Sequence, residues 1–212
     1  KTVLDIGSGP GTLSIPIARV ASQVTAIDYS SKMLDVLNEN SKKKDIANIT
    51  TIQCSWNDNW EEHNISRHDI VIASRSLNIE KLNNGLAKIC KFAKQYVFIA
   101  DRVSPTPFDP VLFKIIGRPF NSGPDYIYTL NLLYQMNIHP NVEMLRSESS
   151  IRFTNRDEAL ASFKWMFKDI TETEENKLIQ YIDQHGKLQP DGSIQFEKSF
   201  PPTWALIWWK KQ

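Results

Sequence analysis

The stretch Thr2-Val3-Leu4-Asp5-Ile6-Gly7-Ser8-Gly9-Pro10-Gly11 decides the fold of this chain. Its first part, residues 2–6, is an apolar run that predicts a fully buried parallel strand. The glycines that follow let the backbone turn tightly and approach a ligand without a Cβ in the way. Residues 12–20 predict a helix, whose free backbone N–H groups point at whatever lies over the turn. The stretch therefore predicts a cofactor cradle, with an ordinary strand-to-helix turn as the alternative.

Two carboxylates and the glycine spacing separate the nucleotide cofactors that use such a cradle. A dinucleotide fingerprint places its third glycine where Thr12 stands here, and usually an apolar residue before the first glycine. In this chain Asp5 stands two residues before Gly7. A second acid, Asp28, ends the next apolar stretch, at the distance where an acid meets ribose hydroxyls. The pattern argues against a nicotinamide-dependent oxidoreductase.

With these acids, the Gly-x-Gly-x-Gly spacing and Tyr29-Ser30 after Asp28, the chain resembles motif I and the Asp-x-Ser turn of the class I S-adenosylmethionine-dependent methyltransferases. The resemblance implies S-adenosylmethionine as cofactor and methyl transfer by in-line displacement. It also implies that the motif I acid helps to hold the amino-acid end of the cofactor. The cofactor-binding residues expected in this region are Asp5, Gly7, Ser8, Gly9, Gly11, Asp28 and Tyr29.

The rest of the first half alternates strand and helix, which predicts a parallel α/β sheet with right-handed crossovers. The resemblance implies a Rossmann-like fold: a seven-stranded, mostly parallel sheet with helices on both faces and an antiparallel last strand. The expected strands lie at residues 2–6, 24–28, 49–53, 68–75, 96–100, 142–145 and 204–211, with 150–153 as an extension of the sixth. Two helical patterns within residues 154–190 then form an insertion between strands six and seven.

The turn after the third strand is where the resemblance places the adenine. The family commonly holds the adenine there through an acid, and the aligned position in this chain is Ser55. Asp58, further along the loop, is the alternative acid. Trp56 is expected to stack on the adenine, with a place in the hydrophobic core as the alternative.

Residues at the tips of the fourth and fifth strands are expected to face the reaction space, because ligands of open parallel sheets lie beyond the carboxyl ends of the strands. Ser74 is expected on the cofactor side. Arg75 is a candidate substrate clamp, because a guanidinium binds a carboxylate or phosphate through two parallel bonds. Pairing of Arg75 with a loop acid is the alternative. Arg102 is the second candidate clamp.

Residues 103–124 interrupt the alternation with several prolines between phenylalanines, which predicts an ordered lid or a wall of the substrate pocket. An oxygen or nitrogen acceptor can require a general base. His139, just before the sixth strand, is the histidine nearest the expected reaction edge, and Tyr126 is the other candidate.

Length, charge and composition further restrict the class of protein. The 212 residues predict a single domain, and a formal charge of +1 gives no argument for a nucleic-acid surface. Two isolated cysteines predict neither a disulfide framework nor a metal site and favour a cytoplasmic protein. No apolar run has the length of a membrane span. Because the sequence begins inside the first strand, we expect an N-terminal helical segment to be missing from it.

Three functions remain open at this stage. The first is a methyltransferase acting on a small, anionic molecule, which the aromatic lid, the near-neutral charge and Arg75 favour. The second is an RNA or protein methyltransferase whose basic surface comes from a segment outside this sequence. The third is a non-catalytic module that keeps the cofactor fold, favoured by the departure at Ser55. The sequence indicates neither the acceptor nor the oligomeric state.

Overall fold

The computed structural model describes residues 1–211, which form two compact units. Unit 1 comprises Lys1–Asp101, Tyr126–Glu143 and the segment that begins at Ala205. Unit 2 comprises Arg102–Asp125 and Met144–Trp204. The single domain that the sequence predicts over residues 1–212 thus contains two compact units and two sheets.

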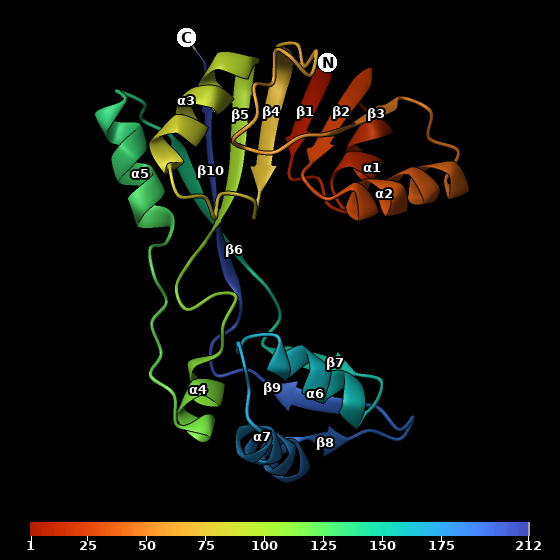
Figure 1. Cartoon of the computed structure of the whole chain (residues 1–212), viewed down its shortest axis with the longest axis vertical. Helices are drawn as coiled ribbons and strands as arrows, with labels where there is room; N and C mark the ends of the chain where they lie inside the picture. The colour runs from red at the N-terminus through yellow and green to blue at the C-terminus, as the bar shows by residue number, and fades with distance from the viewer. Residues whose placement is uncertain (212) are drawn as a thin grey trace. The chain divides into compact units, whose positions relative to one another are not determined.

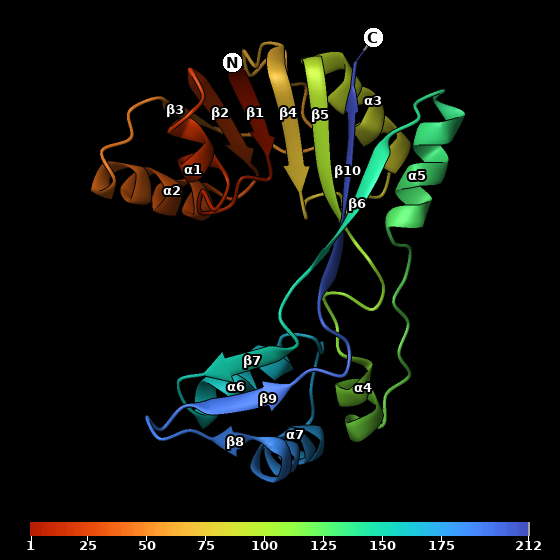
Figure 2. The same cartoon turned by 180° about the vertical axis from the view of Figure 1, so that it is seen from behind.

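Unit 1 is organised around a seven-stranded sheet in the order β3-β2-β1-β4-β5-β10-β6 (Figure 1). The first strand lies in the middle and pairs in parallel with both neighbours, so that Leu4 lies opposite Thr25 on one side and Val71 on the other. The last strand, β10, runs in the opposite direction to β4 (Figure 2), and β5 is parallel to β4. This arrangement confirms the predicted fold class. The strands are β1 (Thr2–Ile6), β2 (Gln23–Asp28), β3 (Ile49–Gln53), β4 (His68–Ser74), β5 (Ala93–Arg102), β6 (Asn141–Arg146) and β10 (Thr203–Lys210).

The helices of unit 1 cover this sheet. They are α1 (Ser14–Ala18), α2 (Ser31–Lys43), α3 (Leu82–Phe92) and α5 (Tyr126–Gln135). Both α1 and α2 contact β2 and β3, while α3 contacts β4 and α5. Leu4, Val71 and Val97 on the central strands are fully buried, as expected for parallel strands covered by helices.

Unit 2 has a three-stranded antiparallel sheet of its own, in the order β7-β9-β8 (Figure 2). Its strands are β7 (Ser150–Phe153), β8 (Lys187–Leu188) and β9 (Ile194–Glu197). Its helices are α4 (Pro110–Ile116), α6 (Arg156–Lys164) and α7 (Glu172–His185). The core between them is rich in aromatic side chains: Phe153, Phe163, Phe167 and Phe196 are buried.

One sequence-based prediction about this region is wrong. Residues 150–153 do not extend the sixth strand but form β7 of the second sheet. Ile151 and Phe153 pack into the aromatic core of unit 2, and alternation of apolar residues cannot indicate which sheet will bury them. Residues 103–124 contain a helix, α4, which Asp109 caps by accepting a hydrogen bond from the backbone N–H of Val111 at 2.9 Å. They belong to unit 2 and contribute to its core, and their role as a lid or a wall of the substrate pocket remains a prediction.

Candidate functional site

The glycine-rich loop joins β1 to α1 and is tied to the end of β2. The backbone N–H groups of Gly7 and Ser8 both donate to the carbonyl of Ile27, at 2.8 and 3.0 Å. The backbone N–H of Gly9 donates to Oδ2 of Asp28 at 2.8 Å, and Oδ1 of the same carboxylate accepts from the backbone N–H of Ser30 at 2.9 Å. These bonds fix the loop and the second acid as one rigid assembly.

Gly7 and Gly9 differ in the space that surrounds them. Gly7 has φ of +69°, and a Cβ there would lie 2.4 Å from Cβ of Ser76, so the loop packs too closely on the end of β4 for any side chain. Gly9 has φ of +54°, but nothing lies within 4 Å of the place where its Cβ would be. Gly7 is therefore required by packing, whereas Gly9 borders open space.

A cavity of about 440 Å³ lies at the carboxyl ends of β1, β2, β3 and β4 in unit 1. Its size falls within the range of about 300–1,000 Å³ that is usual for small-molecule sites, and its position is where open α/β sheets bind ligands. The residues that line it are Ile6, Gly7, Ile27, Asp28, Tyr29, Cys54, Ser55, Trp56, Asn57, Arg75, Ser76, Asn78 and Ile79.

One buried polar atom of the loop lacks a partner. Ser8 is 7% exposed, and its Oγ is buried without a hydrogen bond to any of the described residues. Buried hydroxyls in folded proteins are nearly always bonded. Ser8 does not line the cavity, so its contact with the cofactor remains a prediction.

The loop after β3 supplies the opposite wall of the cavity. Trp56 donates from Nε1 to the carbonyl of Ser76 at 2.9 Å, which holds its ring in place beside the end of β4. Asp58 does not line the cavity; its Oδ2 accepts from the backbone N–H of Ser55 at 2.7 Å, and this hydrogen bond lowers the pKa of Asp58. Asp58 thus stabilises the turn, and the adenine contacts of Ser55 and Trp56, which line the cavity, remain predictions.

Arg75 lies where the sequence places it, at the tip of β4 on the cavity wall. It has φ of +55°, an uncommon conformation for a residue other than glycine, and its backbone N–H donates to the carbonyl of Ala100 at 2.9 Å. Ser74, the preceding residue, does not line the cavity. Sequence reasoning missed Asn78 and Ile79, although both follow the same strand and the position of that strand's end was the available signal.

The motif I acid is buried beneath the loop. Asp5 is 2% exposed, does not line the cavity, and accepts a hydrogen bond from Oγ of Ser14 at 2.5 Å. Burial raises the pKa of Asp5 to about 6; the Ser14 hydrogen bond opposes this rise, and the negative charge of Asp28 adds to it. In this structure Asp5 supports the loop from below, and its contact with the cofactor remains a prediction.

Three other candidates have positions that the sequence could not give. Arg102 donates from Nε and Nη2 to the carbonyl of Pro124, at 2.8 and 2.5 Å, so it holds the segment before α5 and is not assigned as a substrate clamp.

His139 is exposed and precedes β6, which the chain enters at the amino end of the parallel strands, opposite the cavity (Figure 2). We therefore do not retain His139 as the general base. Tyr126 begins α5, whose first turn lies toward the carboxyl ends of β4 and β5 (Figure 1), and it stays a candidate.

Cys54 is less isolated than the sequence suggests. Its thiol, the Asp58 carboxylate and the His63 ring have ligand atoms within 4.8 Å of one another. Burial, followed by the negative charge of Asp58, raises the pKa of Cys54 to about 11, while the positive charge of Lys88 opposes the rise. Lys88 also donates to the backbone carbonyls of Trp56 and Asp58, at 2.7 and 2.8 Å. Because an ammonium already compensates this group, we assign no metal ion to it.

Comparisons with known proteins agree with this geometry. A family model described as "Methyltransferase domain" matches residues 1–177. A protein of uncharacterised function from Haemophilus influenzae strain KW20 Rd is 36% identical over 210 residues, which cover 99% of this chain and 76% of that protein. Among solved structures, a methyltransferase-like protein from Bacillus halodurans C-125 superposes with a TM-score of 0.62 at 14% identity, covering 99% of this chain and 92% of that one. Magnesium protoporphyrin IX methyltransferase from Synechocystis PCC 6803, solved with bound S-adenosylhomocysteine, gives 0.55 at 20% identity, covering 69% of this chain and 68% of that one.

The sheet order, the glycine-rich loop and the second acid define a class I S-adenosylmethionine-dependent methyltransferase. The chain belongs to the methyltransferase family whose model it matches over most of its length. This confirms the family, the enzyme class and the cofactor predicted from motif I. No helix among residues 1–211 is long and apolar enough to cross a membrane.

Proposed function

We propose that this protein transfers the methyl group of S-adenosylmethionine to a small-molecule acceptor. The observation that carries the proposal is the cavity of about 440 Å³ bordered by Gly7 and Asp28, whose size suits a nucleoside cofactor. S-adenosylmethionine supplies an electrophilic methyl group on a sulfonium. The protein's contribution is to position the reactants and exclude water, and positioning alone can be worth about 7–11 kcal/mol of the barrier.

We assign the cofactor contacts to the residues of the cavity wall. The Asp28 carboxylate accepts two backbone N–H groups, and it retains lone pairs for the ribose hydroxyls. Tyr29, Ser55 and Trp56 form the wall on which the adenine is expected to rest. Arg75 is the residue proposed to hold an anionic group of the acceptor.

Two observations favour a small acceptor over nucleic acid. The formal charge of the chain is +1, whereas nucleic-acid enzymes present clustered positive charge. A structural neighbour, magnesium protoporphyrin IX methyltransferase, is named for a small-molecule substrate. These observations support the acceptor class without identifying the acceptor.

Calorimetric titration of the intact protein with S-adenosylmethionine and with S-adenosylhomocysteine tests the cofactor assignment. We expect both to bind, and Asp28→Asn to weaken both by about tenfold or more, because a hydrogen bond to a charged group is lost. Asp35→Asn, at an exposed acid on α2, is the matched control and should bind as the native protein does. Absence of binding by the native protein would overturn the cofactor assignment and favour a non-catalytic module. Equal binding by Asp28→Asn would overturn only the role given to Asp28.

The acceptor class is tested separately with the methyl-labelled cofactor and a cell extract. We expect label to enter the small-molecule fraction. Label recovered in RNA or protein instead would replace the small acceptor with a macromolecular one and leave the cofactor assignment intact.

A further inference from the structure

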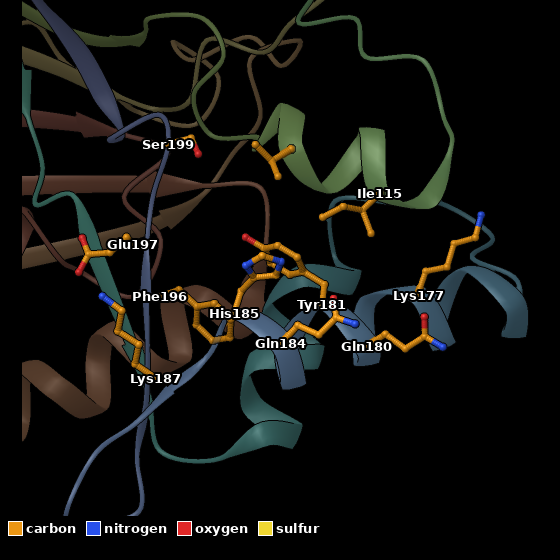
Figure 3. Close-up of a pocket in the computed structure, with 11 residues that line it drawn as sticks. Ile115, Lys177, Gln180, Tyr181, Gln184, His185, Lys187, Phe196, Glu197 and Ser199 are labelled. Atoms are coloured by element: carbon orange, nitrogen blue, oxygen red, sulfur yellow. The ribbon is translucent and has the colours of Figure 1, made fainter.

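Cavities other than the cofactor cavity are present in both units. Unit 2 contains one of about 660 Å³ between α4 and α7, with the rings of Tyr181 and Phe196 at its centre (Figure 3). Lys177, Lys187 and Glu197 also line this cavity, so its wall carries charges of both signs and favours neither an anion nor a cation. Unit 1 contains a smaller cavity whose position is more informative, because it lies directly beside the proposed cofactor site.

This smaller cavity, of about 280 Å³, shares Trp56, Asn57 and Ile79 with the cofactor cavity. Its other wall is formed by α3, which contributes Gly85 and Lys88. Trp56 therefore borders two open spaces, and its side chain is only partly buried. Specific contacts are then needed to hold the ring on which the adenine is expected to rest.

The ammonium of Lys88 supplies such contacts. Its Nζ donates to the backbone carbonyl of Trp56 at 2.7 Å and to that of Asp58 at 2.8 Å. The same Nζ lies 4.9 Å from the centroid of the Trp60 ring, which is within the range of a cation–π interaction. Trp60 is 1% exposed, and its Nε1 donates to the carbonyl of Ser55 at 2.9 Å. Lys88 thus joins the loop after β3 to α3 and to a buried ring.

The close approach of α3 to this loop depends on a glycine. Gly85 lies inside α3, although glycine is unfavourable within a helix. A Cβ at Gly85 would lie 2.5 Å from Cδ1 of Ile79 and 3.6 Å from two ring carbons of Trp56. Gly85 and Lys88 are three residues apart and share one face of the helix. The helix therefore lies close enough for Lys88 to reach the backbone of the loop that carries Trp56.

We propose that Lys88 is a positioning residue for the cofactor: by binding the carbonyls of Trp56 and Asp58, it fixes the Trp56 ring as the wall that stacks on the adenine. Lys88 does not line the cofactor cavity, so it acts through Trp56 and not by contact with the cofactor. Without the ammonium, the loop must be ordered when the cofactor binds, and this ordering lowers the affinity. The inference rests on the proposed function, to which it adds a residue outside motif I.

Calorimetric titration of the intact protein with S-adenosylhomocysteine tests this role. We expect Lys88→Met, which removes the ammonium and keeps a long side chain, to weaken binding by about tenfold. Lys88→Arg keeps a charged donor and should stay within about threefold of the native affinity. Lys91→Met is the matched control. It changes an exposed lysine one turn further along α3, whose ion pair with Glu61 is also exposed, and should bind as the native protein does.

A double-mutant cycle with Trp56 distinguishes positioning from a general structural role. Trp56→Leu alone should weaken binding by about tenfold, because the stacking surface is lost. Lys88→Met should cause less than about a twofold further loss in the Trp56→Leu protein, because the ring that Lys88 positions is absent. Losses that multiply to about a hundredfold in the double variant would show that Lys88 acts independently of Trp56 and would overturn the inference.

The outcomes separate this inference from the function on which it rests. If the native protein binds S-adenosylhomocysteine and Lys88→Met binds it equally well, only the positioning role of Lys88 is overturned. If the native protein does not bind S-adenosylhomocysteine, the proposed function fails and this inference fails with it. Circular dichroism of each variant establishes that a loss of binding is not a loss of folding, and Lys88→Gln takes the place of Lys88→Met if the latter does not fold.

Discussion

At the scale of single residues, Asp5 is the most unusual titratable group of unit 1. It lies almost fully buried beneath the glycine-rich loop, with Ser14 as its hydrogen-bond donor. Burial raises its pKa from the ordinary 3.8 to about 6. An acid whose pKa is higher in the folded than in the unfolded protein favours folding only while it is protonated. Its contribution is fully present below pH 3.8 and is lost as the pH rises through about 6.

We therefore predict that Asp5→Asn removes a pH-dependent loss of stability. For the native protein, the free energy of unfolding should include a decrease of up to about 3 kcal/mol between pH 4 and pH 6.5, since one pKa unit corresponds to about 1.4 kcal/mol. Asparagine keeps an oxygen for Ser14 but does not ionise, so this decrease should be absent from the variant. Urea unfolding at several pH values measures it.

Asp35→Asn, at an exposed acid of α2, is the control for this comparison and should keep the native pH profile. The comparison uses the slope of the unfolding free energy against pH. A change in stability that the amide group causes equally at every pH therefore does not affect it. If Asp5→Asn and the native protein show parallel profiles, Asp5 is ionised in the folded state and the account of its burial is wrong.

At the scale of elements, the first turn of α7 is stabilised by a capping box within the helix and by Arg118, which is far away in the sequence. Thr171 and Glu174 have the spacing of a capping box, and the structure forms it. The backbone N–H of Glu174 donates to Oγ1 of Thr171 at 3.3 Å, and the Glu174 carboxylate accepts from the backbone N–H of Thr171 at 2.9 Å. Arg118 then adds two bonds to the same carboxylate, at 2.6 and 2.8 Å. These hydrogen bonds lower the pKa of Glu174 from 4.5 to about 2, and the bonds from Arg118 have the largest effect.

We predict that Glu174→Gln destabilises unit 2 near neutral pH and that the difference from the native protein narrows in acid. An acid whose pKa is lowered by folding contributes stability above its unfolded pKa of 4.5, and this contribution is lost as the pH falls toward 2. Thermal unfolding at pH 7 and at pH 3.5 measures the difference. Glu172→Gln, at an exposed glutamate in the same first turn, should leave the melting temperature unchanged at both. Equal melting of Glu174→Gln and the native protein at pH 7 would contradict the role of the Arg118 pair.

At the scale of the whole molecule, the two units have separate cores. The aromatic cluster of Phe153, Phe163 and Phe196 lies wholly in unit 2, while Val3, Ala18 and Val24 pack together in unit 1. All the residues that line the proposed cofactor cavity belong to unit 1. Cofactor binding should therefore depend on the core of unit 1 and withstand damage to that of unit 2.

We predict that Phe163→Ala loosens unit 2 and leaves S-adenosylhomocysteine binding intact. Phe163 is 7% exposed and contacts the rings of Phe153 and Phe196, so truncation should cost about 3–5 kcal/mol. Hydrogen exchange followed by mass spectrometry should show faster exchange only in unit 2, residues 102–125 and 144–204. The matched variant Leu86→Ala, at a fully buried position of α3, should raise exchange in unit 1 and weaken binding. Faster exchange across both units in Phe163→Ala would show that they unfold together.

Much of unit 1 could be predicted from the sequence, because its signals are local. The apolar strands, the glycine spacing of motif I and the position of Asp28 lie within a few residues of the contacts they make, and the structure has each of them in place. The position of Arg75 on the cavity wall followed from a simple rule, that ligands lie beyond the carboxyl ends of parallel strands.

Other features were decided by the tertiary structure alone, because they depend on partners far away in the chain. Arg102 is held by the carbonyl of Pro124, and residues 150–153 join a second sheet because unit 2 buries Phe153. His139 lies away from the cavity because the chain enters β6 at its amino end (Figure 2). By itself, then, the sequence determined the cofactor cradle and the class of enzyme, through spacing along one segment. Only the tertiary structure decided the division into two units and the aromatic core of unit 2, since side chains from segments as distant as Leu112 and Phe196 meet there through packing.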